Sequence, residues 1–436
     1  MKVAYISLGC SKNRVDLEYL IGELNEQGHE ITVEIPDADL LVVNTCGFIE
    51  PAVTEAVETI VESAQALKPG AKLAVTGCMT ERYMDEIADE LPEIDFHTGA
   101  GRMDDLLAWL DGRRIKSTQN YRYDKPRVLT TPSYYAYLKI ADGCSNRCSY
   151  CTIPSIRGKL TSRRMEDIVD EAVRLTQSGV KELVIVSQDS TKYGSDIYGK
   201  PKLIELINKL DNVDGDFYIR LMYLNPDGVT EELVEKVNES GRIISYYDMP
   251  VQHFSDEMLK KMNRRSSSAD IAKVFHMIRE KNPDAFIRTT AIVGFPGESE
   301  EDFDKLLSFI KEYKPDFAGF FPYYREEGTP AAEIDIKMDG RNVRGRIGKL
   351  RRAQERNTVE RLKKLKKNDI LCFAEKTNED FDFLIEGRAM FQAPEVDGKV
   401  IFTAGTADSG AGPYTCTIDK IVYPDLYCMM VGEEEI

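Results

Sequence analysis

Three cysteines lie close together in the segment Gly143-Cys144-Ser-Asn-Arg-Cys148-Ser-Tyr-Cys151, where their spacing is C-x3-C-x2-C. Thiolates this close cannot all form disulfides, and the triplet matches the cysteine sets that hold iron–sulfur clusters. A closed four-iron cluster uses four cysteines, so three ligands leave one iron able to bind a further ligand, as in metal sites that perform chemistry. Zinc would need a fourth ligand, and no His or Cys follows nearby. The triplet therefore predicts an open iron–sulfur cluster.

Three further cysteines, Cys10, Cys46 and Cys78, each follow the carboxyl end of a predicted buried strand. We expect these strands over 2–8, 40–43 and 72–76, and helices over 15–27, 51–67 and 81–91. Such alternation predicts a parallel sheet covered by helices, and ligands bind at the carboxyl edge of such sheets. The pattern leaves two interpretations open, a shared metal site or three small buried hydrophobic side chains.

The compartment is predicted from the absence of a signal peptide and of a membrane-spanning run in the 436 residues. The amino terminus has no apolar core of signal-peptide length, and no run of about 18 apolar residues is present. We therefore expect a cytoplasmic protein without a membrane span, in which disulfides are rare. The odd total of nine cysteines argues against a disulfide framework, and Cys372, Cys416 and Cys428 read as buried small hydrophobes.

The elements divide the chain into three predicted domains. Residues 1–115 form the parallel α/β domain, 116–133 are a polar linker, and 134–368 form a barrel that ends in a basic helix. Barrel strands are expected at 135–141, 182–187, 217–222, 244–249, 286–293 and 317–322, which predicts a partial (β/α)6 barrel. Residues 369–436, with strands in FDFLIEGRAMFQ, GKVIFT, YTCTIDKIV and LYCMMV, predict a small antiparallel β-barrel.

Charge is distributed unevenly along a chain whose formal net charge is −17. Residues 1–110 carry 21 acidic and 7 basic side chains, and residues 371–436 carry 13 acidic and 4 basic ones. Residues 341–368 instead hold 12 Lys or Arg against two Glu. Acidic domains suit a basic protein partner, whereas RNA contact, if there is any, falls to 341–368. The alternative is a solvated helix that pairs with the acidic domains.

The cysteine triplet, with Tyr150 before its last cysteine, resembles the signature of the radical S-adenosylmethionine (SAM) superfamily. Over nearly the whole chain the sequence is similar to the methylthiotransferase family. Its motifs SLGCSKNRVDLE, VVNTCGFIEPA, VTGCM, GCSNRCSYCTIPSIRG, SQDSTKYG, DMPVQH, VGFPGE and EGRAMFQAPEVDG resemble the ribosomal-protein aspartate branch, of RimO type. The transfer-RNA branch reads closer to G-C-Q-x-N at the first motif, where this chain has Ser11-Lys12-Asn13 after Cys10.

This resemblance implies an N-terminal methylthiotransferase domain, a radical SAM barrel and a C-terminal TRAM barrel. It also implies two [4Fe-4S] clusters, one on Cys144, Cys148 and Cys151 and one on Cys10, Cys46 and Cys78. The first cluster would bind S-adenosylmethionine and cleave it to methionine and a 5′-deoxyadenosyl radical. The second would hold the sulfur that is methylated and transferred. The implied substrate is the β-carbon of an aspartate in small-subunit ribosomal protein twelve, free or within the ribosomal subunit, and the implied reaction needs a reducing electron donor.

Other barrel residues follow predicted strands, where the active sites of such barrels lie. Tyr150, Gln188, Gln252, Gly294 and Glu298 are the candidate cofactor contacts. Their alternatives are ordinary loop hydrogen bonds or, for the last two, a strand-to-helix turn. His253 reads as a satisfied loop histidine, while Arg220 and Arg288 could face the cofactor carboxylate or pair with a neighbouring acid.

Two rival functions remain at this point. The nearer one is methylthiolation of adenosine in transfer RNA. The other belongs to a different class, a non-catalytic iron–sulfur factor that binds RNA or the ribosome. Substrate assays separate the first from our prediction, and release of 5′-deoxyadenosine separates the second.

Overall fold

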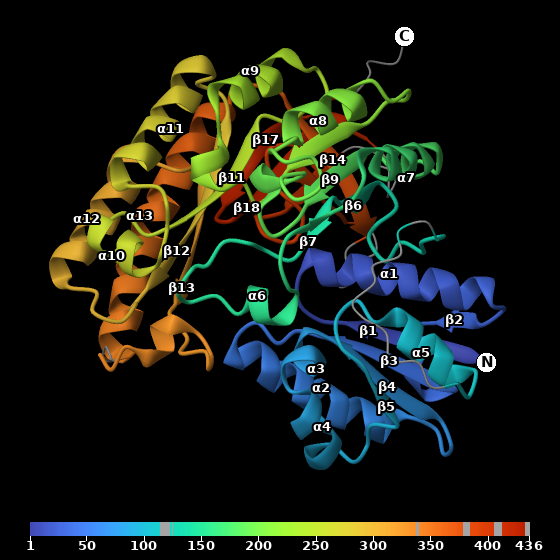
Figure 1. Cartoon of the computed structure of the whole chain (residues 1–436). Coiled ribbons are helices and arrows are strands. Elements are labelled where there is room, and N and C mark those ends of the chain that lie inside the picture. The colour runs from blue at the N-terminus through green and yellow to red at the C-terminus, as the bar shows by residue number, and fades with distance from the viewer. Residues whose placement is uncertain (114–122, 124, 337–339, 378–383, 405–411, 432–436) are drawn as a thin grey trace, which may run out of the picture.

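The computed structural model describes residues 1–113, 123, 125–336, 340–377, 384–404 and 412–431 (Figure 1). Residues 116–122 and 124 of the polar linker predicted at 116–133, and the acidic residues 433–435, lie outside the described residues. The chain forms a parallel α/β layer, a central barrel of parallel strands and a small closed barrel. The mixed α/β class is confirmed, while the limits of the three domains stay predictions.

The N-terminal part is a five-stranded parallel sheet in the order β2-β1-β3-β4-β5. The strands are β1 (Lys2–Ser7), β2 (Glu30–Thr32), β3 (Leu40–Thr45), β4 (Lys72–Gly77) and β5 (Phe96–His97). Every residue of β3 is buried, as expected for an apolar central strand that is covered on both faces.

Helices cover both faces of this sheet: α1 (Ser11–Glu26), α2 (Glu50–Ala66), α3 (Cys78–Arg82), α4 (Met84–Glu90) and α5 (Met103–Leu110). Leu17 and Leu106 pack with Val42 on one face, whereas residues of α2, α3 and α4 pack on the other. The single helix predicted over 81–91 is wrong. Helix begins earlier, at Cys78, and is interrupted at Tyr83, whose φ of −124° and ψ of 36° are not helical.

The central barrel has the six predicted parallel strands, β6 (Tyr135–Lys139), β9 (Glu182–Val186), β10 (Tyr218–Leu221), β11 (Tyr246–Gln252), β12 (Phe286–Val293) and β13 (Phe317–Pro322). They form two three-stranded sheets, β10-β9-β6 and β11-β12-β13, which an isolated parallel bridge between Ile219 and Ile243 joins. The short pair β7 (Ala141–Asp142) and β8 (Thr161–Ser162) follows the first strand.

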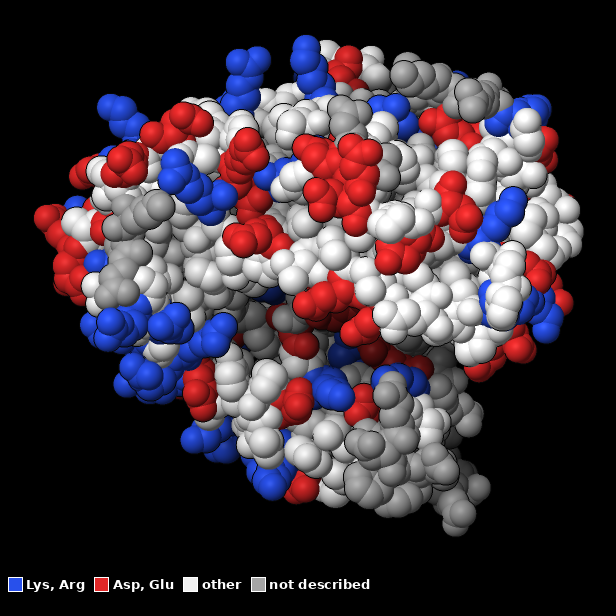
Figure 2. All heavy atoms as spheres, turned by 90° about the horizontal axis from the view of Figure 1, so that it is seen from below, with Lys and Arg blue, Asp and Glu red and all other residues white. Residues whose placement is uncertain are grey.

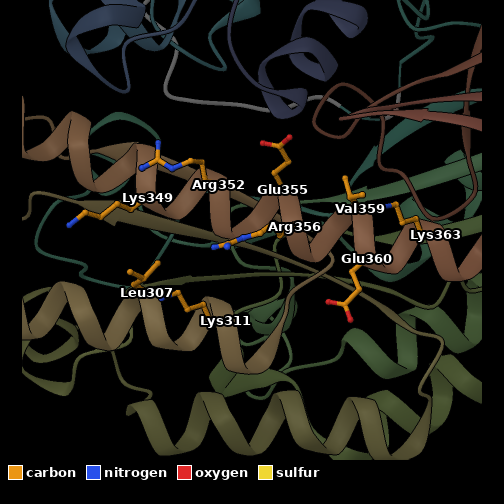
Figure 3. A pocket seen from close by; sticks show the side chains of 9 residues that line it. All are labelled: Leu307, Lys311, Lys349, Arg352, Glu355, Arg356, Val359, Glu360 and Lys363. Carbon is orange, nitrogen blue, oxygen red and sulfur yellow. The ribbon is translucent and has the colours of Figure 1, made fainter.

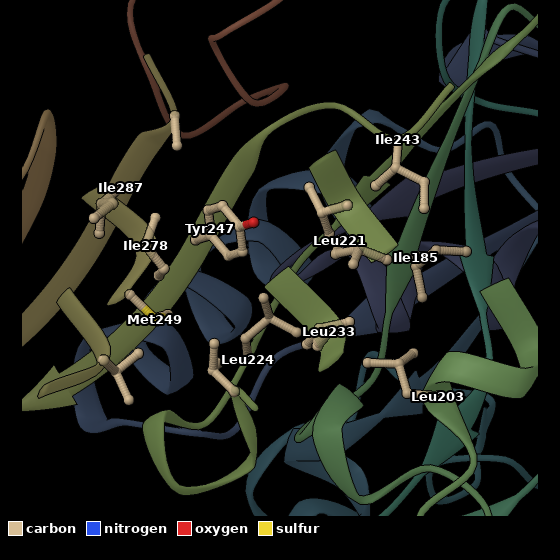
Figure 4. Close-up of a cluster of buried hydrophobic side chains, with 14 of the residues drawn as sticks. Ile185, Leu203, Leu221, Leu224, Leu233, Ile243, Tyr247, Met249, Ile278 and Ile287 are labelled. Carbon is tan, nitrogen blue, oxygen red and sulfur yellow. The ribbon is translucent and has the colours of Figure 1, made fainter. Parts of the chain in front are cut away.

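Helices surround the barrel strands: α6 (Ile153–Ile156), α7 (Met165–Gln177), α8 (Leu203–Asp211), α9 (Glu231–Glu239), α10 (Asp256–Lys261), α11 (Ser268–Lys281), α12 (Glu300–Tyr313) and α13 (Gly340–Leu365). The apolar side chains between strands and helices form one large buried cluster, part of which Figure 4 shows around Ile185, Leu221 and Tyr247. Burial of this apolar area is the main force that holds the strands in place.

The C-terminal part is a closed barrel in the order β14-β15-β16-β18-β17. Its strands are β14 (Ile370–Thr377), β15 (Ile385–Ala389), β16 (Val400–Ala404), β17 (Tyr414–Val422) and β18 (Asp425–Met430). The sequence prediction missed β14, and the barrel is not wholly antiparallel because β16 and β18 pair in parallel. Cys372, Cys416 and Cys428 are fully buried in its core, as predicted.

The small barrel packs against the amino ends of the central strands. Phe373 stacks on Tyr134, just before β6, with ring centroids 5.4 Å apart, and Phe391 stacks on Phe286, the first residue of β12, at 4.4 Å. Glu182, the first residue of β9, pairs with Arg388 of β15. The carboxyl ends of the central strands are therefore left to the loops that carry the cysteines.

Helix α1 lies between the N-terminal sheet and the central barrel (Figure 1). Val15 and Tyr19 on α1 join a buried cluster that includes Tyr135 and Tyr137 of β6. Buried ion pairs strengthen the same junction, since Arg127 lies 2.6 Å from Glu18 on α1 and 2.7 Å from Glu171 on α7. None of the described helices is both long and apolar enough to cross a membrane.

Candidate active site

Cys144, Cys148 and Cys151 lie on one tight loop directly after β7. The Cys144 N–H donates to the Gly158 carbonyl at 3.1 Å, and the Cys151 N–H donates to the Cys148 carbonyl at 3.1 Å. Gly143 has a φ of +66°, and a Cβ there would lie 2.2 Å from the Lys159 carbonyl oxygen, so only glycine fits. These contacts hold the three thiols together at the carboxyl end of the barrel.

Backbone and cationic donors surround these thiols. The Asn146 and Ile153 N–H groups donate to Cys144 and Cys151, but burial outweighs them and raises the pKa of the two thiols to about 11 and about 12. The Arg264 guanidinium lies 3.9 Å from the Cys148 sulfur. A positive charge and N–H donors favour bound thiolates, as metal ligands must be deprotonated.

Cys10, Cys46 and Cys78 come together at one edge of the N-terminal sheet. The strand order places β1 and β3 at the point where the chain reverses direction across the sheet, the usual ligand position in this topology. Cys10 and Cys46 follow these two strands, and Cys78 follows the neighbouring β4. A Cβ on Gly9, beside Cys10, would lie 3.1 Å from the Cys46 sulfur, and Cys10 and Cys78 are near enough to Cys46 to help raise its pKa. The predicted juxtaposition of the three loops is therefore observed.

Two asparagines tie these loops to one another. Asn13 donates to the Leu8 carbonyl at 2.8 Å and to the Thr45 carbonyl at 3.1 Å, and Asn44 donates to the Asn13 carbonyl at 2.7 Å. The Thr45 hydroxyl then reaches the Thr76 carbonyl at 2.7 Å. The three loops are thus linked in the order of their strands.

The three N-terminal thiols differ in their surroundings. Desolvation would raise the pKa of Cys10, but Lys12 and Arg157, with the N–H groups of Asn13 and Lys12, hold it below its ordinary value. Burial raises the pKa of Cys46 to about 11 and also raises that of Cys78. Cys10 reaches solvent whereas Cys78 is buried, so this site opens at Cys10.

The two cysteine groups face each other across the junction between the sheet and the barrel. Arg157, just after α6, donates to the Cys78 sulfur at 3.3 Å and pairs at 2.7 Å with Asp142, two residues before Cys144. The Thr152 hydroxyl, next to Cys151, donates to the Phe48 carbonyl, next to the Cys46 loop, at 3.2 Å. Side chains around one group therefore contact the loops of the other.

Buried charges complete this junction. Asp16 on α1 pairs with Arg157 at 2.9 Å and with Lys139 of β6 at 2.5 Å. Lys139 also pairs with Asp142, and these neighbours hold the pKa of Asp142 well below its usual range despite burial. Two carboxylates and two cations thus balance one another in the interior, which buried charges require.

The donor sets suit clusters better than single ions. Among the described residues, no three His, Cys, Asp or Glu side chains are arranged to hold one metal ion. In an iron–sulfur cluster the cysteines bind different irons, so their sulfurs stand farther apart. Each group offers three thiols, and N–H or guanidinium donors point at sulfur in both. Such donors are what tunes the potential of a cluster.

The candidate cofactor contacts lie at the same end of the barrel. Gln188 follows β9 and donates to Asp142 at 2.7 Å, while its carbonyl oxygen is buried without a partner among the described residues. Tyr150 packs against Met258, Met262 and Phe295. Gln252 ends β11 in a left-handed conformation with a φ of +68°, which side chains rarely adopt outside functional or strained sites.

Gly294 and Glu298 form a closed turn. The Gly294 N–H donates to Glu298 at 2.5 Å, and the other Glu298 oxygen pairs with Arg346 of α13 at 2.5 Å. Helix α12 begins directly afterwards at Glu300. Both carboxylate oxygens therefore have partners inside the protein, in line with the turn interpretation.

Arg220, Arg288 and His253 are engaged elsewhere. Arg220 lies 2.6 Å from Glu182 and Arg288 lies 3.1 Å from Asp248, so both arginines pair with neighbouring acids. His253 accepts from the Ser255 N–H at 3.0 Å, and burial lowers its pKa to about 4, so the ring is neutral at physiological pH. It lies in a loop, as expected, but it is only partly satisfied, because its Nε2 is buried without a hydrogen-bond partner among the described residues.

Sequence reasoning missed the residues that join the two cysteine groups. Arg157 and Asp16 carry no spacing signal, although Arg157 stands only six residues after Cys151. Lys12 was also missed; its ammonium lies 3.4 Å from the centroid of the Tyr223 ring, between Cys10 and the barrel. A charged side chain within a few residues of a ligand cysteine is the signal that could have indicated Arg157 and Lys12.

The central barrel and its cysteine loop define a radical SAM enzyme. A model of the radical SAM superfamily matches residues 138–310, and the model described as uncharacterized protein family UPF0004 matches residues 2–99. The first match contains the loop of Cys144, and the second contains Cys10, Cys46 and Cys78.

Relatives that align with more than nine-tenths of the chain identify its family within the radical SAM enzymes. The ribosomal protein uS12 methylthiotransferase RimO of Geobacter sulfurreducens is 42% identical over 420 residues, 94% of each chain. That of Clostridioides difficile is 44% identical over 411 residues, 92% of each chain. The chain therefore belongs to the RimO family of methylthiotransferases and is a radical SAM enzyme.

Solved structures agree with the fold. The radical SAM methyltransferase TsrM of Kitasatospora setae superposes with a TM-score of 0.56 at 16% identity and covers 76% of each chain. The cobalamin-dependent radical enzyme OxsB gives a TM-score of 0.51 at 11% identity, over 80% of this chain and 56% of that one. At these identities the likeness concerns architecture alone.

Proposed function

We propose that the protein methylthiolates the β-carbon of an aspartate in small-subunit ribosomal protein uS12. The observation that carries this proposal is the identity of 42 to 44% with enzymes named for that substrate, over more than nine-tenths of both chains. The two facing cysteine groups support it, because a methylthio transfer needs a radical source and a sulfur source close together.

We further propose that Cys144, Cys148 and Cys151 hold a [4Fe-4S] cluster that cleaves S-adenosylmethionine, and that Cys10, Cys46 and Cys78 hold a second cluster. When bound, the first supplies one electron to S-adenosylmethionine, and the second supplies the site for the transferred sulfur. The chain's own contribution is to fix the two loops against each other through Arg157.

Five further residues are proposed to serve the cofactor. Gln188 has an amide oxygen without a partner among the described residues beside Asp142, Tyr150 lies on the cysteine loop, and Gln252 ends β11 at the same end of the barrel. Gly294 would bring its backbone close to the cofactor, while Glu298 acts as a positioning residue that holds this turn.

The substrate protein and the reductant are the proposed partners. We place the reaction in the cytoplasm, with an electron donor that reduces the first cluster and a substrate that is free or in the small subunit. A basic ribosomal protein would be attracted by the acidic N-terminal and C-terminal parts, whose balances are −14 and −9.

A paired substrate assay tests the function. The reconstituted full-length enzyme is incubated with S-adenosylmethionine, a reductant and either uS12 or transfer RNA, and both products are analysed by mass spectrometry. We expect a thiomethyl gain on one aspartate of uS12 and none on the RNA. A gain on transfer RNA alone would overturn the proposal, and absence of 5′-deoxyadenosine would favour a non-catalytic factor.

Two cysteine variants test the assignment of the clusters. Cys148→Ala should abolish 5′-deoxyadenosine formation, whereas Cys46→Ala should spare it and stop sulfur insertion. Iron after anaerobic reconstitution should approach about eight per chain in the wild type and about four in either variant, because each proposed cluster holds four irons. Insertion that survives in Cys46→Ala would contradict the second cluster.

A further inference from the structure

A groove runs between α12 and α13 on the outer side of the central barrel (Figure 3). It encloses about 780 Å³. Helix α13 supplies most of its lining and α12 supplies the rest: Leu307, Lys311, Lys349, Arg352, Glu355, Arg356, Val359, Glu360 and Lys363. From Lys349 to Lys363 this stripe of α13 is about 21 Å long, at about 1.5 Å per residue.

The groove is basic in a strongly acidic protein. Five lining residues are Lys or Arg and two are Glu, and Lys314 pairs with one of these, Glu360, at 2.9 Å. Lys311, Arg352, Arg356 and Lys363 are exposed, and the described residues offer them no ion-pair partner. In Figure 2, which shows the molecule from below, Lys and Arg gather at the lower left and Asp and Glu are spread over the upper part.

The bases of α13 divide into two sets. Arg346 pairs with Glu298 and Glu300, and Arg361 pairs with Asp316, so these two arginines anchor the helix to the barrel. The predicted alternative, a helix whose bases pair with the acidic domains, does not describe the groove-lining bases. Their positive charge is available to an external partner.

We propose that this groove binds the phosphodiester backbone of RNA. Phosphate contacts require exposed Lys and Arg and no apolar anchor. A protein partner would instead seek aromatic and apolar anchors at the centre of the interface, but only Leu307 and Val359 among the lining residues are apolar. The chain as a whole carries a net charge of −17, so this groove is a local basic site on an acidic protein.

The biological setting of this contact rests on the proposed function, because a ribosomal protein in its particle is surrounded by RNA. RNA held on the outer helices would bring the particle to the enzyme while the carboxyl end of the barrel stays open to the substrate loop. The groove would thus favour substrate in a ribonucleoprotein particle over free substrate.

Equilibrium binding tests the proposal without using catalysis. The full-length protein is titrated into a fluorescein-labelled 20-nucleotide RNA hairpin over a series of salt concentrations, and anisotropy is recorded. Affinity should fall steeply with salt. Arg352→Glu/Arg356→Glu should weaken binding at least about tenfold and reduce the salt slope by about two, for two lost phosphate contacts.

The matched control is Arg164→Glu/Lys209→Glu, which changes the net charge equally. Arg164 directly precedes α7 and Lys209 lies on α8; both are exposed outside the groove and lie 3.8 Å and 3.6 Å from Glu166. Its affinity for the RNA should stay within about twofold of the wild type, because both residues lie outside the groove. The fold should be kept, since exposed ion pairs contribute little to stability. Equal weakening by both double variants, or no binding by the wild type, would overturn the proposal.

Two further arms complete the design. A polyglutamate peptide that displaces the RNA at equal charge concentration would favour an acidic protein partner and also overturn the proposal. Lys311→Glu/Lys363→Glu, which alters both helices, repeats the test should the first variant fold poorly. Methylthiolation of free uS12 by Arg352→Glu/Arg356→Glu should match the wild type, so loss of RNA binding is distinguished from failure of the proposed function.

Discussion

Arg157 is the side chain through which the two cysteine groups are linked. Its guanidinium has five donors in a planar fork, and it reaches the Cys78 sulfur, Asn13, Asp16 and Asp142 at once. A lysine could balance the charge but could not span these partners. We therefore expect this residue to act on the structure of the junction and on the electrostatics of the proposed second cluster.

Replacing Arg157 separates these two effects. Arg157→Met leaves Asp16 and Asp142 with Lys139 as their buried cation and should cost about 3–5 kcal/mol of stability. In the background Cys144→Ala/Cys148→Ala/Cys151→Ala, it should also make the midpoint potential of the remaining cluster more negative, because a positive charge and an N–H donor to sulfur are lost. Urea unfolding and an EPR-monitored redox titration measure the two effects.

Arg157→Lys is the control for Arg157→Met. It keeps the charge and should recover much of the potential but little of the hydrogen bonding. An unchanged potential in Arg157→Met would mean that the residue only holds the domains together.

Among single residues, the cysteines could be predicted from the sequence, whereas the charged residues that contact them in space could not. The six cysteines could be found because thiols at fixed spacing or at strand ends imply metal chemistry. Arg157 lies 79 residues from Cys78 and 141 from Asp16, and no local pattern encodes such contacts. Lys139 could not be recognised either, because a charged residue inside an apolar strand does not indicate which side chains it pairs with.

The strands that precede the cysteines could be predicted where burial makes their sequence a continuous apolar run. The strand β3 is buried at every position and reads as a continuous apolar run. The strand β14 was missed because its sequence, ILCFAEKT, ends in polar residues and lies directly after a long helix. The break at Tyr83 was missed because helical spacing continues through it. Parallel pairing of β16 with β18 depends on barrel closure, which local sequence does not specify.

Replacing Gly77 tests whether the site needs the close approach of the carboxyl ends of β3 and β4. Its φ of +109° is open to glycine, and a Cβ would lie 2.5 Å from the Thr45 carbonyl oxygen. Gly77→Ala should cost about 1–2 kcal/mol for the backbone conformation and about 1–3 kcal/mol more for the clash. It should also reduce iron bound in the Cys144→Ala/Cys148→Ala/Cys151→Ala background, because the turn places Cys78.

Gly70→Ala is the matched control. Gly70 has a φ of +84°, but a Cβ there meets nothing within 4 Å. It should therefore show the backbone cost alone and normal iron content. Equal stability and iron content in the two variants would contradict the view that close approach of the β3 and β4 ends shapes the site.

The whole molecule divides its tasks between the two ends of the central barrel. The small barrel covers the amino ends of the strands, and Glu395, between its strands β15 and β16, reaches α1, where it lies 2.8 Å from Arg14. Helix α1 and the N-terminal sheet meet the carboxyl ends directly. Sequence predicted the three parts but not this placement, because each part is locally encoded and their docking depends on side chains far apart in the chain.

Glu182 tests whether buried charge holds the small barrel in place. It is fully buried, lies 2.6 Å from Arg220 and also pairs with Arg388 of β15, which Glu375 contacts as well at 2.7 Å. Glu182→Gln should lower the first unfolding midpoint by the equivalent of about 3–5 kcal/mol, since Arg220 loses its ion-pair partner and Arg388 keeps only Glu375. Arg388→Met should cost less because Arg220 still neutralises Glu182, and the double variant should be less unstable than the sum of the two.

Urea unfolding followed by limited proteolysis at the small barrel measures this series, with Lys209→Met as the exposed-pair control. That control should change stability by less than about 1 kcal/mol. Formation of 5′-deoxyadenosine at low temperature should be nearly unchanged in Arg388→Met, because the altered junction lies at the opposite end of the strands from Cys144, Cys148 and Cys151. Wild-type stability in Glu182→Gln would show instead that stacking of Phe373 and Phe391 on the barrel rings is sufficient to dock the two barrels.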